Sequence, residues 1–76
     1  MSAKAYILIE TQVGKSKDVT KTIKKISGVQ SVDQVTGPYD IITVIEADTL
    51  SDVGAVVTDR IHPIEGIART VTCLAV

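Results

Sequence analysis

Two short runs of this chain are apolar on both faces of an extended strand. Residues 5–9 (AYILI) and 41–45 (IITVI) are long enough to form strands and rich in the side chains that strands favour. Because successive side chains of a strand point to opposite faces, each run places apolar groups above and below a sheet. A chain of 76 residues has few other segments that could cover both faces of such a sheet.

The segment between residues 10 and 28 has the pattern of an amphipathic helix. Val19, Ile23 and Ile26 recur at positions i, i+4 and i+7, which places them on one helical face. Ser16 stands where an N-cap is expected, and Gly28 stands where a C-cap glycine is common. We therefore expect a helix that begins after Ser16 and ends before Gly28.

A second helix is predicted between residues 49 and 63. Thr49 and Asp52 resemble a capping box in which Asp replaces the usual Glu. Pro63 is expected to end the helix, because proline disfavours the helical conformation in the residue before it. The apolar stripe of this helix consists of Leu50, Val53, Val57, Ile61 and Ile64.

Predicted strands at residues 29–35 and 67–76 complete a β-α-β-β-α-β order, with a Gly-Pro turn between the second and third strands. This order is that of the ferredoxin-like α+β fold, a four-stranded antiparallel sheet with two helices on one face. A shift of 38 residues supports it by aligning equivalent positions of the two halves. It pairs Ile7 with Ile45, Thr11 with Thr49, Val19 with Val57, Ile23 with Ile61 and Gly28 with Gly66.

The predicted arrangement leaves one face of the sheet without cover. The helices bury only one of the two apolar sets, and the other forms an exposed apolar surface. A domain of this size is also marginally stable alone, and its single cysteine, Cys73, excludes an internal disulfide. We expect a homodimer in which two copies pack sheet against sheet. The alternative is that loops cover this face, but the chain has almost none to spare.

The charge pattern is nearly balanced. Eight basic and nine acidic residues give a net charge of −1. The lysines at positions 15, 17, 21, 24 and 25 form either a solvated helix face or, as a second interpretation, an anion or nucleic-acid surface. With no signal-peptide core, no membrane-length apolar run and an unpaired thiol, we expect a soluble, cytoplasmic protein.

The residues that catalysis or metal binding needs are sparse. His62, the only histidine, stands at an expected helix end, where interaction with the helix dipole is the simpler interpretation. Cys73 has no basic neighbour in the sequence to activate it. No metal-binding, phosphate-loop or dinucleotide motif is present. We therefore expect no enzyme activity, no cofactor and no metal ion.

The segment Gly37–Asp40 (GPYD) is harder to explain by packing alone. Asp40 directly precedes an apolar strand, where β propensity disfavours it. It either makes a turn-type hydrogen bond to nearby amides or accepts the ammonium group of a ligand, with the glycine turn presenting amides to a carboxylate. Thr70 and Thr72 share a face of the last strand, as plain strand formers or as hydroxyl donors.

With these features the chain resembles the effector-binding domain of Lrp/AsnC transcriptional regulators, also called the RAM domain. The resemblance covers residues 1–76 as a single domain, and its most specific part is the Gly-x-Tyr-Asp segment within residues 32–41. It implies the βαββαβ fold, sheet-to-sheet dimers, further assembly into rings, and amino acids bound near interfaces between dimers. Carried over, it implicates Gly37, Tyr39, Asp40, Thr70 and Thr72 in ligand binding.

Full-length members of the family carry a helix-turn-helix before this domain, whereas we expect none before the first strand here. We therefore expect a stand-alone amino-acid-binding module with no direct DNA binding and no membrane contact. Its partners would be a small effector, other copies of itself and full-length regulators. Two alternatives stay open: an assembly domain without ligand, and a small enzyme of the dimeric α+β barrel type, for which only Arg69 and His62 are available.

Overall fold

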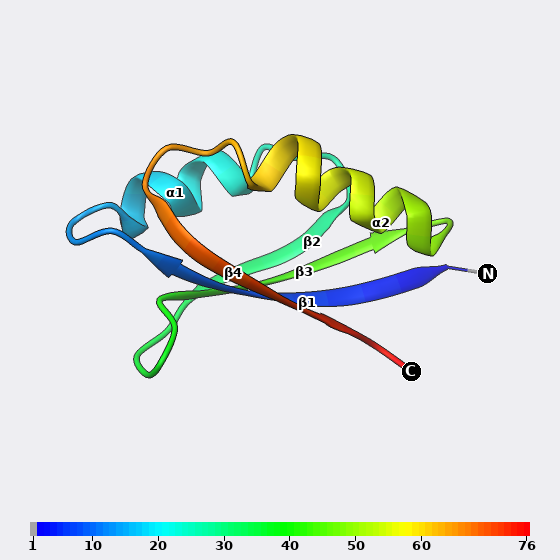
Figure 1. Ribbon diagram of the computed structural model, residues 1–76, viewed down its shortest axis with the longest axis horizontal. Helices are drawn as coiled ribbons and strands as arrows, with labels where there is room; N and C mark the ends of the chain where they lie inside the picture. The colour runs from blue at the N-terminus through cyan, green and yellow to red at the C-terminus, as the bar shows by residue number, and fades with distance from the viewer. Residues whose placement is uncertain (1) are drawn as a thin grey trace.

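The computed structural model describes residues 2–76 and shows the predicted order of elements (Figure 1). The strands are β1 (Ala3–Thr11), β2 (Val29–Gln34), β3 (Ile41–Ala47) and β4 (Ile67–Leu74). The helices are α1 (Ser16–Ile23) and α2 (Leu50–Val56), and α2 continues into a π-helical turn, η1 (Val57–Ile61). The sheet is antiparallel in the order β2-β3-β1-β4, with both helices on one face. The predicted ferredoxin-like α+β fold is confirmed.

The core lies between the helices and one face of the two central strands. Alternate residues of β1 and β3 are fully buried there, and Tyr6 on the opposite face is 39% exposed. Thr43 is also buried in this layer, and its hydroxyl donates to the Ser31 carbonyl at 2.7 Å, so its polar group is satisfied. The apolar core consists of Ala5, Ile7, Ile9, Val19, Ile23, Ile41, Ile45, Val53, Val57 and Ile61.

The two halves of the chain pack alike, as the 38-residue shift predicts. Ile23 and Ile61 are both fully buried in the helix layer. Gly28 and Gly66 both have positive φ angles, of 94° and 102°, and both lead into edge strands. The carbonyl of each glycine accepts a backbone N–H from residues at the end of a central strand. The halves therefore share their turn geometry as well as their apolar pattern.

Both ends of α1 differ from the prediction. Lys15, rather than Ser16, is the N-cap residue, and no side chain caps the helix there. The helix stops at Ile23, so Gly28 is not its C-cap. Ile26 packs against the core from the turn that follows the helix. The apolar spacing therefore indicated burial correctly, although the backbone has already left the helical conformation.

The second helix begins as predicted and then widens. Thr49 caps it by accepting the N–H of Asp52 at 3.1 Å. The π-turn was not expected: the His62 N–H donates to the Val57 carbonyl, five residues earlier, at 2.9 Å. Val57 and Ile61, the first and last residues of this turn, are both buried. Leu50, predicted in the same apolar stripe, is instead 55% exposed at the start of α2.

Both edge strands carry an irregularity in register. β4 shifts against β1 between Glu10 and Thr11. β2 shifts against β3 between Val29 and Ser31. Irregularities of this kind bend a strand and increase its local twist.

Gly66 is predicted to be poorly replaceable, because it passes directly beside the start of α1. A Cβ added there would lie 2.9 Å from the Lys15 Cβ and 3.1 Å from the Val19 Cγ2. Gly66→Ala should lower the free energy of unfolding by about 2 kcal/mol or more, since the left-handed backbone alone costs alanine roughly 1–2 kcal/mol.

The matched control is Gly14→Ala, because Gly14 also has a positive φ but has no atom within 4 Å of an added Cβ. It should show the backbone cost only, in the same urea denaturation experiment. Equal losses in the two variants would show that the close approach to α1 is unimportant.

Candidate functional site

The predicted ligand-binding turn lies at the tip of the β2–β3 hairpin. The Val35 N–H donates to the Asp40 carbonyl at 2.9 Å and closes the loop. Gly37 and Pro38 are exposed at the tip, and an added Cβ at Gly37 would meet no atom within 4 Å. Three of the five residues predicted for ligand binding therefore lie on one short, open loop. They are Gly37, Tyr39 and Asp40.

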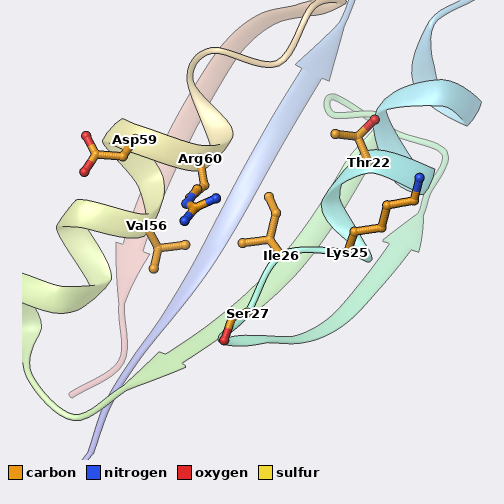
Figure 2. A pocket seen from close by; sticks show the side chains of 7 residues that line it. All are labelled: Thr22, Lys25, Ile26, Ser27, Val56, Asp59 and Arg60. Carbon is orange, nitrogen blue, oxygen red and sulfur yellow. The ribbon is translucent and has the colours of Figure 1, made fainter.

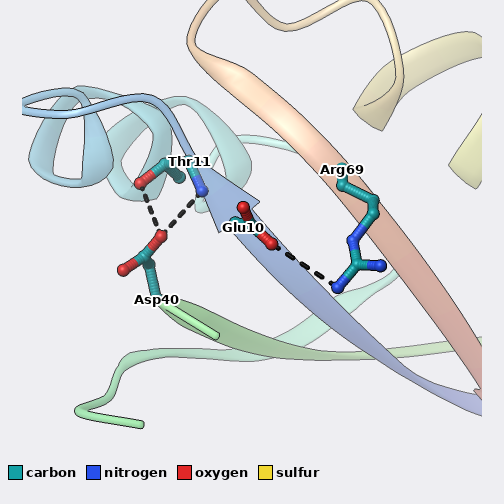
Figure 3. Close-up of polar contacts among 4 residues, drawn as sticks. All are labelled: Glu10, Thr11, Asp40 and Arg69. Atoms are coloured by element: carbon teal, nitrogen blue, oxygen red, sulfur yellow. Dashed lines mark hydrogen bonds and ion pairs between the residues drawn. The ribbon is translucent and has the colours of Figure 1, made fainter. Parts of the chain in front are cut away.

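The half-buried Asp40 carboxylate joins this loop to the end of β1 (Figure 3). Its Oδ2 accepts the Thr11 N–H at 2.8 Å and the Thr11 hydroxyl at 3.1 Å. The Asp40 N–H also donates to the Ile9 carbonyl at 2.9 Å. These bonds join Asp40 to β1, a strand distant in sequence. The turn interpretation had instead predicted hydrogen bonds to amides close in sequence. The second oxygen, Oδ1, points away from Thr11 (Figure 3) and accepts no hydrogen bond from residues 2–76.

Tyr39 extends from the loop toward β4. The guanidinium carbon of Arg69 lies 5.8 Å from the centre of the Tyr39 ring. Arg69 Nη2 also lies 3.5 Å from Glu10 Oε2, its partner in the β1–β4 register (Figure 3). An exposed ion pair of this kind adds little to stability. It does place an aromatic ring, a cation and a carboxylate together beside the turn.

The sheet face opposite the helices carries a continuous apolar area, which we call the open-face block. In register, residues of β1 lie between residues of β3 on one side and β4 on the other. Charged pairs flank the block, Lys4 with Glu46 at one end and Glu10 with Arg69 at the other. An apolar centre with a charged rim is typical of protein interfaces. The block consists of Tyr6, Leu8, Ile42, Val44, Val71 and Cys73.

The two threonines lie on the helix side of the sheet. Thr70 pairs with Ile9 and Thr72 with Ile7, both of which are buried beneath the helices. The Thr70 hydroxyl is 3.2 Å from Nε2 of His62. Thr72 lines a shallow groove of about 350 Å³ between α2 and β4. Within one chain the structure therefore separates both threonines from the three turn residues.

The residues considered for catalysis are also separated. His62 contacts Thr70 on the helix side, whereas Arg69 lies on the open face beside Glu10. In the part of the chain from residue 2 to 76, no cluster of three His, Cys, Asp or Glu residues could hold a metal ion. In the same residues, no helix is long and apolar enough to cross a membrane.

Thr11, which holds the Asp40 carboxylate, is the residue of the candidate site that sequence reasoning missed. It belongs to no motif, and its contact with Asp40 spans 29 positions. The one available signal was its alignment with Thr49 in the 38-residue shift, which indicated a shared position but no partner. The contact depends on the register of β1 against β3.

Asp40→Ala should lower the free energy of unfolding by about 1–3 kcal/mol, because the Thr11 N–H and hydroxyl both lose their acceptor. Asp40→Asn keeps an acceptor of the same shape and should lose less. Asp48→Ala removes an exposed carboxylate just beyond the opposite end of β3 and should leave stability nearly unchanged. Urea denaturation measures all three. Equal losses for Asp40→Ala and Asp48→Ala would show that the Thr11 contacts contribute nothing.

Residues 4–76 match the family model of the Lrp/AsnC ligand binding domain. An uncharacterized HTH-type transcriptional regulator of Pyrococcus furiosus is 36% identical over 59 residues, which are 78% of this chain and 39% of that protein. The chain thus spans about two fifths of the length of this relative.

Solved structures show the same fold. The protein TTHA0845 from Thermus thermophilus is 31% identical, with a TM-score of 0.92 over 97% of this chain and 92% of its own. AsnC from E. coli, at 17% identity, superposes on 97% of this chain with a TM-score of 0.91, and this region is 50% of AsnC. Together with the family match over nearly every residue, these similarities show that the chain belongs to the Lrp/AsnC family, as a ligand-binding domain.

Proposed function

We propose that this chain is an oligomeric sensing module that binds an amino acid, or a similar small zwitterion, at the hairpin turn. The family membership supports a domain that senses a small effector. The observation that supports amino-acid binding at this turn is the geometry of the Asp40 carboxylate. Thr11 holds one of its oxygens, and the other is directed away from the protein contacts (Figure 3).

A carboxylate fixed in this way suits a ligand ammonium group. Its orientation is set before binding, so little conformational entropy is lost when the charge-assisted hydrogen bond forms. Within residues 2–76 the N–H groups of Gly37 and Tyr39 donate to no protein acceptor, and they can bind the ligand carboxylate. The ring of Tyr39, held beside Arg69, offers an apolar surface to the rest of the ligand.

Thr70 and Thr72 face the helix layer, so we propose that they contribute hydroxyls from a neighbouring subunit. A site at a junction between subunits can use the turn of one chain and β4 of another. This agrees with the family resemblance, which implies ligand sites near interfaces between dimers. Binding would then depend on assembly.

The open-face block is the surface that we propose for dimerisation. It spans three adjacent strands, and sheet-on-sheet packing of a second copy removes its apolar side chains from water. Full-length regulators of the family have a domain of the same fold and are further candidate partners. We propose that this domain by itself does not bind DNA, because its net charge is −1.

One observation favours a second candidate, an assembly domain without ligand. The bonds to Thr11 give Asp40 a structural role that explains its presence before β3. An enzyme is less well supported, because His62 and Arg69 lie on opposite sides of the sheet. A binding experiment separates the first two candidates.

Thermal-shift screening against the twenty amino acids should identify a ligand, because binding to the native state raises its apparent stability. In calorimetry with that ligand, Asp40→Asn should weaken binding roughly ten- to a hundredfold, since charge-assisted hydrogen bonds contribute about 1.5–3 kcal/mol. Asp48→Asn removes the same charge elsewhere and should bind like the wild type. Unchanged affinity in Asp40→Asn, with the assembly intact, would assign Asp40 to the turn alone.

Val44→Asp should dissociate or unfold the protein, because it places a charge in the middle of the open-face block. Ala55→Asp, on the exposed side of α2, is the control and should sediment like the wild type. Analytical ultracentrifugation measures the mass, and circular dichroism reports folding. A folded wild-type monomer at micromolar concentration would contradict dimerisation through this face.

A further inference from the structure

A cleft of about 710 Å³ lies in the helix layer, between the C-terminal end of α1 and η1 (Figure 2). Its volume falls within the range of roughly 300–1,000 Å³ found for small-molecule sites. It is formed by the helix layer, whereas the hairpin turn lies between β2 and β3 at the end of the sheet (Figure 1). None of the residues proposed for the amino-acid site lines it.

Cationic side chains line this cleft from both walls. The Arg60 guanidinium turns into the space between the helical segments, whereas the Asp59 carboxylate lies on the outer side of the same turn (Figure 2). Lys25 extends along the opposite wall beside Thr22 (Figure 2). The ion pair on the open face is the only one within residues 2–76. Neither cation of the cleft therefore has a carboxylate partner there.

Arg60 lies within the π-turn η1. An insertion of this kind changes the direction of the side chains that follow it, and π-turns are frequent at functional sites. The neighbouring helix adds to the positive potential, because five of the eight basic residues are lysines between positions 15 and 25. Of these lysines, Lys25 lines the cleft itself.

The interior of the cleft is apolar. Ile26 and Val56 are half-buried; Ile26 lies between Arg60 and Lys25, and Val56 lies beside Arg60 (Figure 2). The Ser27 and Thr22 hydroxyls add neutral hydrogen-bonding groups at one wall. Apolar surface beside the unpaired Arg60 guanidinium matches a ligand with an apolar body and a charged end.

We propose that this cleft is a second ligand site, for a small organic anion. Its phosphate or carboxylate group binds Arg60, and its apolar body packs on Ile26 and Val56. The guanidinium fork binds two oxygens of either group, and Lys25 on the opposite wall adds positive potential. Such a ligand would bridge α1 and η1.

Amide chemical-shift titration of the isotope-labelled full chain tests the proposal. The probes are phenyl phosphate, benzoate and inorganic phosphate, with phenol as the uncharged control. Amides of residues 22–27 and 56–60 should move together with one dissociation constant for phenyl phosphate or benzoate. Inorganic phosphate should bind more weakly, because it lacks the apolar body, and phenol should not saturate. Comparison of phenyl phosphate with benzoate identifies the preferred anionic group.

Arg60→Gln should weaken binding roughly tenfold, as expected for loss of a charge-assisted hydrogen bond, and Lys25→Gln should weaken it only about threefold, because Lys25 acts through its positive potential. Arg69→Gln and Lys17→Gln remove the same charge elsewhere and should change the affinity less than about twofold. Asp40→Asn should also have no effect, so this site and the amino-acid site are tested separately.

Three results would overturn the proposal. One is the absence of saturable shifts at the cleft with either aromatic anion. Another is a set of shifts spread evenly over the lysines of α1 and insensitive to Arg60→Gln, which would indicate diffuse attraction. The third is equal binding of phenol, which would remove the role of the charge.

Discussion

The central position of β1 governs the rest of the structure. This strand pairs with β3 on one side and β4 on the other, and its alternating side chains serve two separate layers. Ile7 and Ile9 are buried beneath the helices, while Tyr6 and Leu8 form the middle of the open-face block. β1 pairs with β3 as far as Ile9 and with β4 as far as Thr11. At this end of the strand, Thr11 binds the Asp40 carboxylate of the hairpin turn.

Most of the fold was predictable because apolar periodicity records burial. The double-faced strands, the two helical stripes and the 38-residue correspondence indicated which residues face the core, and the structure agrees except at Leu50, which is exposed. The same signal says nothing about backbone hydrogen bonds. Ile26 continues the stripe of α1 from a turn, and Val57 and Ile61 continue that of α2 through a π-turn. Helix ends and helix type were therefore the parts that the pattern could not define.

The candidate site was likewise predictable only in part. Asp40 stood out because an acid is unusual before an apolar strand, and the shared face of the two threonines followed from simple alternation. Thr11 as the partner of Asp40 depends on strand register, and the side on which the threonines lie depends on where the helices pack. The helix-layer cleft was beyond reach for a similar reason, since Arg60 and Lys25 face it only through the arrangement of two helical segments.

The register irregularities in the two outer strands have a consequence for solubility. An exposed strand edge is a template on which other chains can add strands, and such growth has no natural end. Both edges of this sheet, β2 and β4, contain a bulge that disturbs the regular ladder there. Extension into fibrils is thereby disfavoured at both sides. The open-face block, through which we propose dimerisation, differs from a strand edge, because a single partner would cover it and leave no further surface of that kind.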